Sequence, residues 1–250
     1  MSHTTVWRNR DRHLDLTPGV LHEEALGRAW EWGERVAVLD AAGGGAIAYG
    51  ELVAAAERFA AALVARDARR GDVLSLVASN GTDFPVAMHG ALRAGLTLAP
   101  ASPLLTAREL GAFLRQVRAR FVVADAGARH TAAEAARAAG VETVLALESL
   151  PAGEPAALEG VDPRAIALLM SSSGTTGLPK SAAHTHAGAV AMLRGFAAFP
   201  LTRLGPDDVV GGVIPNDCPT AQPRRARHSR SISVGHGAAP MSTSRSEDRS

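Results

Sequence analysis

Two patterns of hydrophobic positions alternate along this chain, and together they predict alternating helices and strands. Segment 50–66 has helical spacing, because Leu52, Phe59 and Leu63 fall on one face while Glu51 falls elsewhere. The same reasoning predicts helices over 21–32, 82–95, 106–118, 131–139 and 185–199, and strands over 35–40, 46–49, 72–78, 96–101, 120–125, 141–147 and 165–170. Strands that alternate with helices imply an α/β fold with mainly parallel sheets flanked by helices.

Local signals refine three of these elements. Glu109 stands three residues after Thr106, which predicts a capping box at the start of helix 106–118. The strands at 35–40 and 46–49 are separated by a glycine-rich turn and are predicted to pair as a hairpin. A further strand is expected to begin within 207–215.

The pattern divides the chain into three parts. Residues 1–20 are polar and are expected to be a loose leader, whereas orderly alternation runs through 21–215. Segment 216–250 contains six arginines and seven serines but no Leu, Phe, Trp or Lys. Such a segment buries too little apolar surface to offset its ordering entropy, so a disordered tail is predicted. An Arg/Ser arm that binds nucleic acid is the alternative interpretation of the tail.

Composition excludes several classes of protein. The net charge of +1 gives no indication of a nucleic-acid partner for the chain as a whole. The single cysteine, Cys218, excludes a disulfide framework and a cysteine zinc site, and it favours a cytoplasmic location. No apolar run approaches the roughly 18 residues that a membrane span needs, so none is expected.

Candidate chemistry lies in segment 172–180, directly after the predicted strand 165–170. A loop that binds a polyphosphate between a strand and a helix typically has three features. Its glycines let the backbone approach the phosphate closely, its hydroxyls donate hydrogen bonds, and a lysine at its end supplies positive charge. A Walker-type loop does not fit, because Pro179 stands where that loop needs an amide and a helix start. An ordinary polar surface loop remains the other alternative. The candidate phosphate-binding residues are Ser172, Ser173, Gly174, Thr175, Thr176, Gly177 and Lys180.

Segment 172–180 resembles the phosphate-loop signature of the adenylate-forming (AMP-binding) superfamily, and within it the acyl-CoA synthetases and 4-coumarate-CoA-ligase-like enzymes. The resemblance extends over about residues 20–215. Its other landmarks are Ala48-Tyr49-Gly50-Glu51-Leu52, Gly71-Asp72-Val73 with Asn80, Ala94-Gly95 followed by Pro100 and Pro103, Ala124-Asp125, and Thr185-His186.

The resemblance implies two half-reactions. A carboxylic acid is activated by ATP to an acyl-adenylate with release of pyrophosphate, and a thiol, usually coenzyme A, then displaces AMP. By the same resemblance Ser173, Thr175, Thr176 and Lys180 hold the β- and γ-phosphates, with Mg²⁺ as the metal cofactor. His186 is expected to pack or to cap the following helix rather than to transfer protons.

Two departures from the family pattern lie beside the loop: Ser171 stands where an aromatic residue is common, and Ser181 replaces the usual glycine. The family's magnesium-binding glutamate and its C-terminal catalytic lysine are not found in 216–250. An amino-acid sequence rich in Arg, Ser, Ala and Pro, such as 216–250, is what a shifted reading frame produces in a GC-rich gene. We therefore expect a truncated or frameshifted ligase, incomplete after Pro215 and inactive alone, with no metal ligand of its own. A nucleotide-binding module without catalysis and a non-functional remnant are the alternatives.

Overall fold

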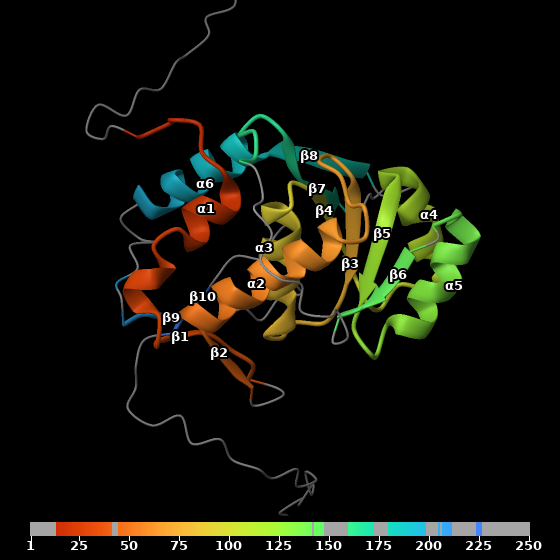
Figure 1. Cartoon of the computed structure of the whole chain (residues 1–250), viewed down its shortest axis with the longest axis horizontal. Coiled ribbons are helices and arrows are strands. Elements are labelled where there is room, and N and C mark those ends of the chain that lie inside the picture. Colours follow the sequence, from red (N-terminus) through yellow and green to blue (C-terminus); the bar gives the residue numbers. More distant parts are fainter. Residues whose placement is uncertain are drawn as a thin grey trace, which may run out of the picture.

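The computed structural model describes residues 14–41, 45–141, 143–147, 160–172, 180–198, 205, 207–211 and 224–226. Its centre is a six-stranded sheet in the order β6-β5-β3-β4-β7-β8, in which all neighbours are parallel except β7 and β8 (Figure 1). The strands are β3 (Val73–Val77), β4 (Thr97–Ala101), β5 (Ala119–Ala124), β6 (Thr143–Ala146), β7 (Ile166–Ser172) and β8 (Lys180–Thr185). The predicted α/β fold with a mainly parallel sheet is thereby confirmed.

Both faces of this sheet are buried, and β5 shows why its strands are nearly continuous apolar runs. Phe121 and Val123 belong to one hydrophobic cluster, while Val122 and Ala124 belong to the other. Successive side chains of a strand point to opposite faces, so a strand covered on both sides needs apolar residues throughout. Helices α2 (Tyr49–Val64) and α3 (Asp83–Arg93) cover the first face, and α4 (Ala107–Val117) and α5 (Arg129–Ala139) cover the second.

Side-chain caps set where two of these helices begin. At α4, the Glu109 backbone N–H donates to Thr106 Oγ1 at 3.3 Å, and the Thr106 N–H donates to Glu109 Oε2 at 2.9 Å. This is the predicted capping box. At α2, the Ala48 N–H donates to Glu51 Oε2 at 2.9 Å, so the acidic residue of the Ala48–Leu52 landmark serves the helix start.

Other family landmarks are also structural. Gly71 and Gly95 adopt φ angles of +81° and +76°, which favour glycine, and the Gly71 N–H donates to the Gly95 carbonyl oxygen at 3.0 Å. They bring the turn before β3 against the turn before β4. Beyond the opposite ends of the strands, Asp125 accepts hydrogen bonds from the backbone N–H groups of Ser79 and Ala128, both at 2.8 Å. These landmarks therefore hold turns and strand ends in place.

The N-terminal part packs beside the sheet. The predicted helix 21–32 is divided into α1 (Leu21–Leu26) and the 3₁₀-helix η1 (Ala29–Trp32). Strands β1 (Val36–Leu39) and β2 (Ala46–Ala48) form the predicted antiparallel hairpin. Figure 1 shows α1 lying against α6 (His186–Ala198).

Three residues of the segment expected to be disordered are paired. Strand β10 (Arg224–Ala226) lies antiparallel to β9 (Val209–Gly211), which falls within the predicted strand region 207–215. The other residues of 216–250 lie outside the described part of the chain. Within the described part, no helix is both long and apolar enough to cross a membrane.

Candidate functional site

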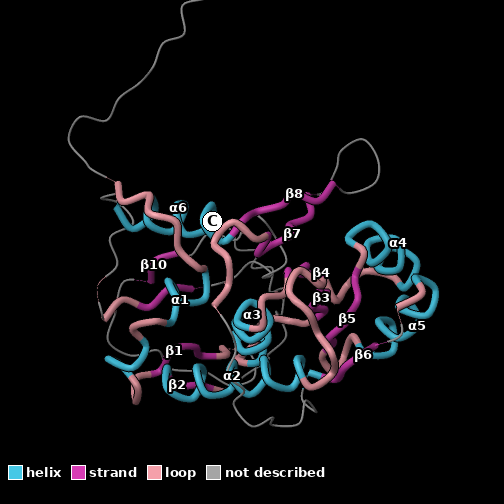
Figure 2. Tube along the Cα trace, turned by 45° about the horizontal axis from the view of Figure 1, so that its top comes forward, coloured by secondary structure: helices cyan, strands magenta, loops and turns pink. Residues whose placement is uncertain are grey.

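The candidate phosphate loop connects the two strands of a hairpin. Strands β7 and β8 pair from Ile166 opposite Thr185 to Ser172 opposite Lys180, so the two ends of segment 172–180 are directly opposed (Figure 2). The five inner candidates, Ser173, Gly174, Thr175, Thr176 and Gly177, lie outside the described residues. For Ser172 and Lys180 the structure describes the backbone, which places both at the same end of the hairpin.

The helix predicted over 185–199 is confirmed, but the sequence did not predict the strand that lies between it and the loop. Lys180 begins β8, and α6 starts only at His186, because residues 180–185 complete a ladder with β7. Hydrophobic spacing did not reveal this edge strand, whose Ala182 and Ala183 are exposed. A Walker loop leads into a helix at its lysine, so the strand that begins at Lys180 confirms that this loop is of another class.

The hairpin emerges at the carboxyl edge of the parallel strands. Strand β7 runs beside β4, where Leu168 pairs with Leu98 and the Thr97 hydroxyl donates to the Ile166 carbonyl oxygen at 2.8 Å. Parallel strands end at a common edge, and ligands of open α/β sheets bind outside this edge. Segment 172–180 therefore leaves the sheet where a ligand site of this fold class is expected.

The two departures from the family pattern are partners across the hairpin. Ser171 and Ser181 are paired residues, and their Oγ atoms lie 3.3 Å apart. The Gln116 side chain of α4 donates from Nε2 to Ser181 Oγ at 3.3 Å. Polar contacts therefore connect the strands beside the loop to each other and to α4. Sequence reasoning noted both serines separately but missed Gln116, because no motif links positions 65 residues apart.

Thr185 and His186 join the hairpin to α6. Thr185 Oγ1 accepts a hydrogen bond from the Gly188 N–H at 3.1 Å and so caps α6. The His186 side chain is buried, and its Nδ1 accepts a hydrogen bond from the Leu21 N–H at 3.2 Å. Burial lowers the pKa of His186, which favours the neutral imidazole. The expected packing role is confirmed, but the helix that His186 caps is α1, whereas Thr185 caps the following helix.

A protein ligand set for Mg²⁺ is not found in the described part of the chain. Within that part, no cluster of three or more His, Cys, Asp or Glu side chains is arranged so that it could hold a metal ion. Mg²⁺ prefers carboxylate and other oxygen ligands.

The similarity to known proteins covers the part of the chain that carries these features. The family profile "AMP-binding enzyme" matches residues 27–219, more than half of the chain. The chain is 32% identical over 192 residues to 4-coumarate--CoA ligase 3 of Oryza sativa subsp. japonica, covering 72% of this chain and 35% of the ligase. It is 34% identical over 203 residues to the salicyl-AMP ligase / salicyl-S-ArCP synthetase of Mycobacterium tuberculosis, again covering 72% and 35%. The chain thus spans about a third of the length of these curated relatives.

Solved structures agree at the level of the fold. A benzoate CoA ligase from Burkholderia xenovorans LB400 has a TM-score of 0.57 and 26% identity, over 68% of this chain and 35% of that one. The luciferase-like enzyme from the mealworm Zophobas morio has a TM-score of 0.65 at 19% identity, over 74% of this chain and 47% of that one, which shows a common fold. On the profile match and these similarities, the chain belongs to the AMP-binding enzyme family.

Proposed function

We propose that segment 172–180 binds the β- and γ-phosphates of ATP during the activation of a carboxylic acid. The supporting observation is the β7–β8 hairpin, which opposes Ser172 and Lys180 at the carboxyl edge of the parallel strands. The two ends of the segment therefore lie beside each other at this edge of the sheet. Glycines in the loop allow close approach of the backbone, and hydroxyls and the lysine supply donors and positive charge.

The proposed reaction has two displacements. A carboxylate oxygen attacks the α-phosphorus of ATP, the bond from that phosphorus to the bridging oxygen of the β-phosphate breaks, and pyrophosphate leaves. A thiol sulfur, that of coenzyme A, then attacks the acyl carbon and AMP leaves. Negative charge grows on the departing pyrophosphate in the first step, so donors already placed around it stabilise the transition state. No step is assigned to a metal ion.

Basic composition adds support for Lys180. Of the 26 basic residues in the chain, 25 are arginines, and Lys180 is the only lysine. Arginine and lysine are not interchangeable at phosphate sites, since lysine presents a compact charge and arginine a planar fork. A chain that uses arginine at every other basic position and lysine at the end of this loop favours a specific role for the ammonium group.

We assign nucleotide binding to this chain itself. Whether it also catalyses the reaction is a separate question that the exchange assay below answers. The alignment with the rice ligase covers 35% of that enzyme, so the whole reaction of the relatives is not transferred. A nucleotide-binding module without catalysis is the second candidate function. Pyrophosphate exchange into ATP, measured with a panel of carboxylic acids, separates the two: exchange dependent on one acid shows the first half-reaction, and binding without exchange favours the module.

Calorimetric titration with ATP and Mg²⁺ tests the proposed site. Loss of a charge-assisted contact to phosphate corresponds to about 1.5–3 kcal/mol, so Lys180→Ala is expected to weaken binding roughly 10- to 100-fold, and Lys180→Arg less. Arg137→Ala, an exposed position on α5, is the control for loss of one positive charge. Equal affinity of Lys180→Ala and wild type would contradict the proposal.

The single lysine allows a direct second measurement. Reductive methylation with ¹³C-formaldehyde labels amines and keeps their charge, so only Lys180 and the N-terminal amine give signals. ATP is expected to shift the Lys180 signal and leave the N-terminal signal in place. An unchanged Lys180 signal at saturating ATP would place the nucleotide elsewhere.

A further inference from the structure

Helix α1 has an N-terminal cap that comes from a distant part of the chain. Its N-cap residue, Val20, has no side-chain acceptor, so the first N–H groups of the helix need partners from elsewhere. The Leu21 N–H finds one in Nδ1 of His186, 165 residues further along the chain and 3.2 Å away. The His186 side chain is 1% exposed, so this contact is shielded from water.

The same residue closes the base of the hairpin that carries the candidate loop. The His186 backbone N–H donates to the Ala165 carbonyl oxygen at 3.1 Å, and the Ala187 N–H donates to that of Pro163 at 2.8 Å. Ala165 directly precedes β7, and His186 directly follows β8. His186 therefore joins the base of the hairpin through its backbone and the start of α1 through its side chain.

We propose that His186 is a positioning residue for segment 172–180: as a neutral imidazole it ties the base of the β7–β8 hairpin to α1, and protonation breaks this tie. The proposal rests on the function proposed above for that segment. A nitrogen that accepts a hydrogen bond uses its lone pair, and protonation turns it into a donor. Two donors, His186 Nδ1–H and the Leu21 N–H, would then face each other.

The surroundings of His186 disfavour its charged form. On α1, the His22 ring lies edge-on with its centroid 6.5 Å from that of His186, and Glu23 and Glu24 follow. On α3 are His89 and Arg93, and His22 and His89 are both buried with Nδ1 atoms that have no hydrogen-bond partner in the described structure. Strand β7 contributes no charged residue, and β8 contributes Lys180, at the end away from His186, and an exposed His184.

The nearby carboxylates are engaged or exposed. Glu24 is bound by Arg194 of α6, Glu57 of α2 is bound by Arg93 at 2.9 Å, and Glu23, 62% exposed, lies 4.0 Å from His22. A buried imidazolium at His186 would therefore lie beside a second buried histidine, His22, whereas the carboxylates named above are exposed or already paired. Neutral His186 is the form that fits this site, and acid is expected to displace it.

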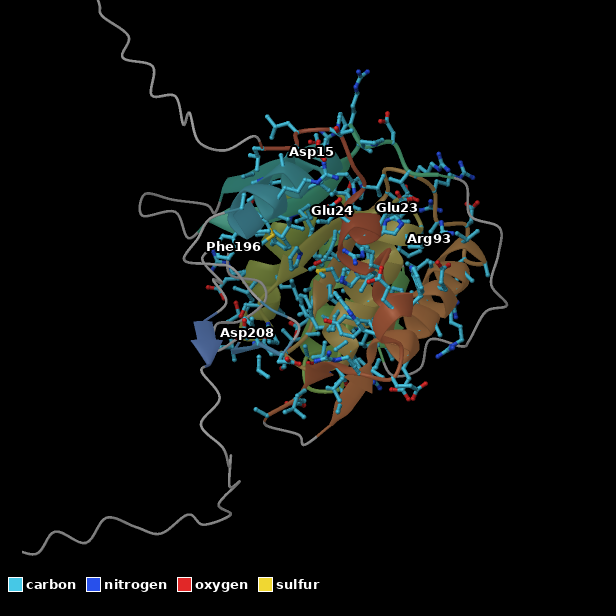
Figure 3. The ribbon with its side chains drawn as sticks, turned by 90° about the vertical axis from the view of Figure 1, so that its left-hand side faces the viewer. Asp15, Glu23, Glu24, Arg93, Phe196 and Asp208 are labelled. Carbon is cyan, nitrogen blue, oxygen red and sulfur yellow. The ribbon has the colours of Figure 1, made fainter. Side chains whose placement is uncertain are left out.

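A second link to α6 supplies the control. The Arg194 guanidinium binds Glu24 through two hydrogen bonds of 2.8 Å and Asp15 through one of 2.9 Å, and it donates to the Thr17 carbonyl oxygen at 3.0 Å. Part of the expected loose leader is thus held on α6. Figure 3 shows Asp15, Glu23, Glu24 and Arg93 on this side of the molecule. Arg194→Lys weakens this link without altering the His186 acceptor.

Amide hydrogen exchange between pH 7.5 and 4.5, corrected for the intrinsic effect of pH, tests the proposal. In the wild type, protection of the Leu21 amide and of the β8 amides is expected to fall together as the pH is lowered. His186→Leu leaves the Leu21 N–H without an acceptor and is expected to accelerate exchange at both places about tenfold at every pH. His186→Asn places an oxygen near the Nδ1 position, and it is expected to keep the protection and to reduce its pH dependence to that of the core β5 amides, which report the global loss of stability in acid.

ATP affinity, measured for the same proteins, links the tie to the loop. His186→Leu is expected to bind ATP more weakly than the wild type, and His186→Asn is expected to bind it as the wild type does. Arg194→Lys, the control, is expected to leave the pH profile of β8 protection unchanged. Unaltered β8 protection in His186→Leu would overturn the inference. So would a pH dependence of β8 protection in His186→Asn that still exceeds that of the β5 amides. Failure of the wild type to bind ATP would instead overturn the proposed function, and the exchange results would remain interpretable.

Discussion

Gly90 of α3 packs directly against α2, and a methyl group there is predicted to destabilise the fold. A Cβ at Gly90 would lie 2.8 Å from the Ala56 carbonyl oxygen, 2.8 Å from Phe59 Cδ1 and 2.9 Å from Phe59 Cβ. Phe59 is 5% exposed and belongs to the core cluster beneath the two helices. The carbonyl oxygen is part of the α2 backbone, so the clash can be relieved only if the helices separate.

Two effects of opposite sign decide the magnitude for Gly90→Ala. Alanine improves on glycine by about 1 kcal/mol in a helix interior. Overpacking of a close contact costs roughly 1–3 kcal/mol, with the upper part of the range expected where the contact is to backbone. We expect a net loss of about 1–2 kcal/mol in the free energy of unfolding. For a domain of this size this lowers the melting temperature by roughly 2–8 °C.

The same substitution at Gly195 is the control. Gly195 lies in α6, and the nearest neighbour of an added Cβ would be Leu14 Cδ2 at 3.8 Å, an ordinary van der Waals distance. Gly195→Ala is therefore expected to be neutral or to stabilise by up to about 1 kcal/mol. Thermal unfolding followed by circular dichroism compares the two variants. If Gly90→Ala were as stable as Gly195→Ala, the inferred close approach of the helices would be wrong.

Two further predictions concern stability. Thr106→Ala removes the cap of α4 and is expected to lower the free energy of unfolding, measured with urea, by about 1 kcal/mol. Thr106 and Glu109 belong to one capping box, so Glu109→Ala is expected to lower it less in the Thr106→Ala background than in the wild type. Fully additive losses in the double variant would contradict the capping box. Burial lowers the pKa of His89 to about 4, from 6.5. Between pH 4 and pH 6.5 the unfolded chain therefore binds a proton at His89 that the folded chain does not. The free energy of unfolding is not reduced by His89 above pH 6.5, and it falls by up to about 3 kcal/mol as the pH is lowered toward 4. His89→Leu should flatten the curve of unfolding free energy against pH, and an unchanged slope would show that His89 titrates normally.

Local patterns were sufficient for most of the fold. The predicted strand 120–125, with its apolar residues 121–124, and the helical spacing of 50–66 correspond to β5 and α2. Burial of both faces of a strand gives a continuous apolar run, and burial of one face of a helix gives a helical period, and both are visible in the chain itself. The capping box at Thr106 was equally visible, since both partners lie within one helical turn. Edge strand β8 was not found, because it buries little apolar surface and is defined by its pairing with β7.

The amino-acid sequence by itself determined the alternation of strands and helices, the family of the chain and the identity of the candidate phosphate-binding segment. These properties depend on residue types at short, regular separations. Only the tertiary structure decided that Lys180 begins a strand, that Ser181 meets Ser171 and Gln116, and that His186 caps α1. The physical reason is that such contacts join residues 8 to 165 positions apart, and the packing of layers that creates them leaves no period in the sequence.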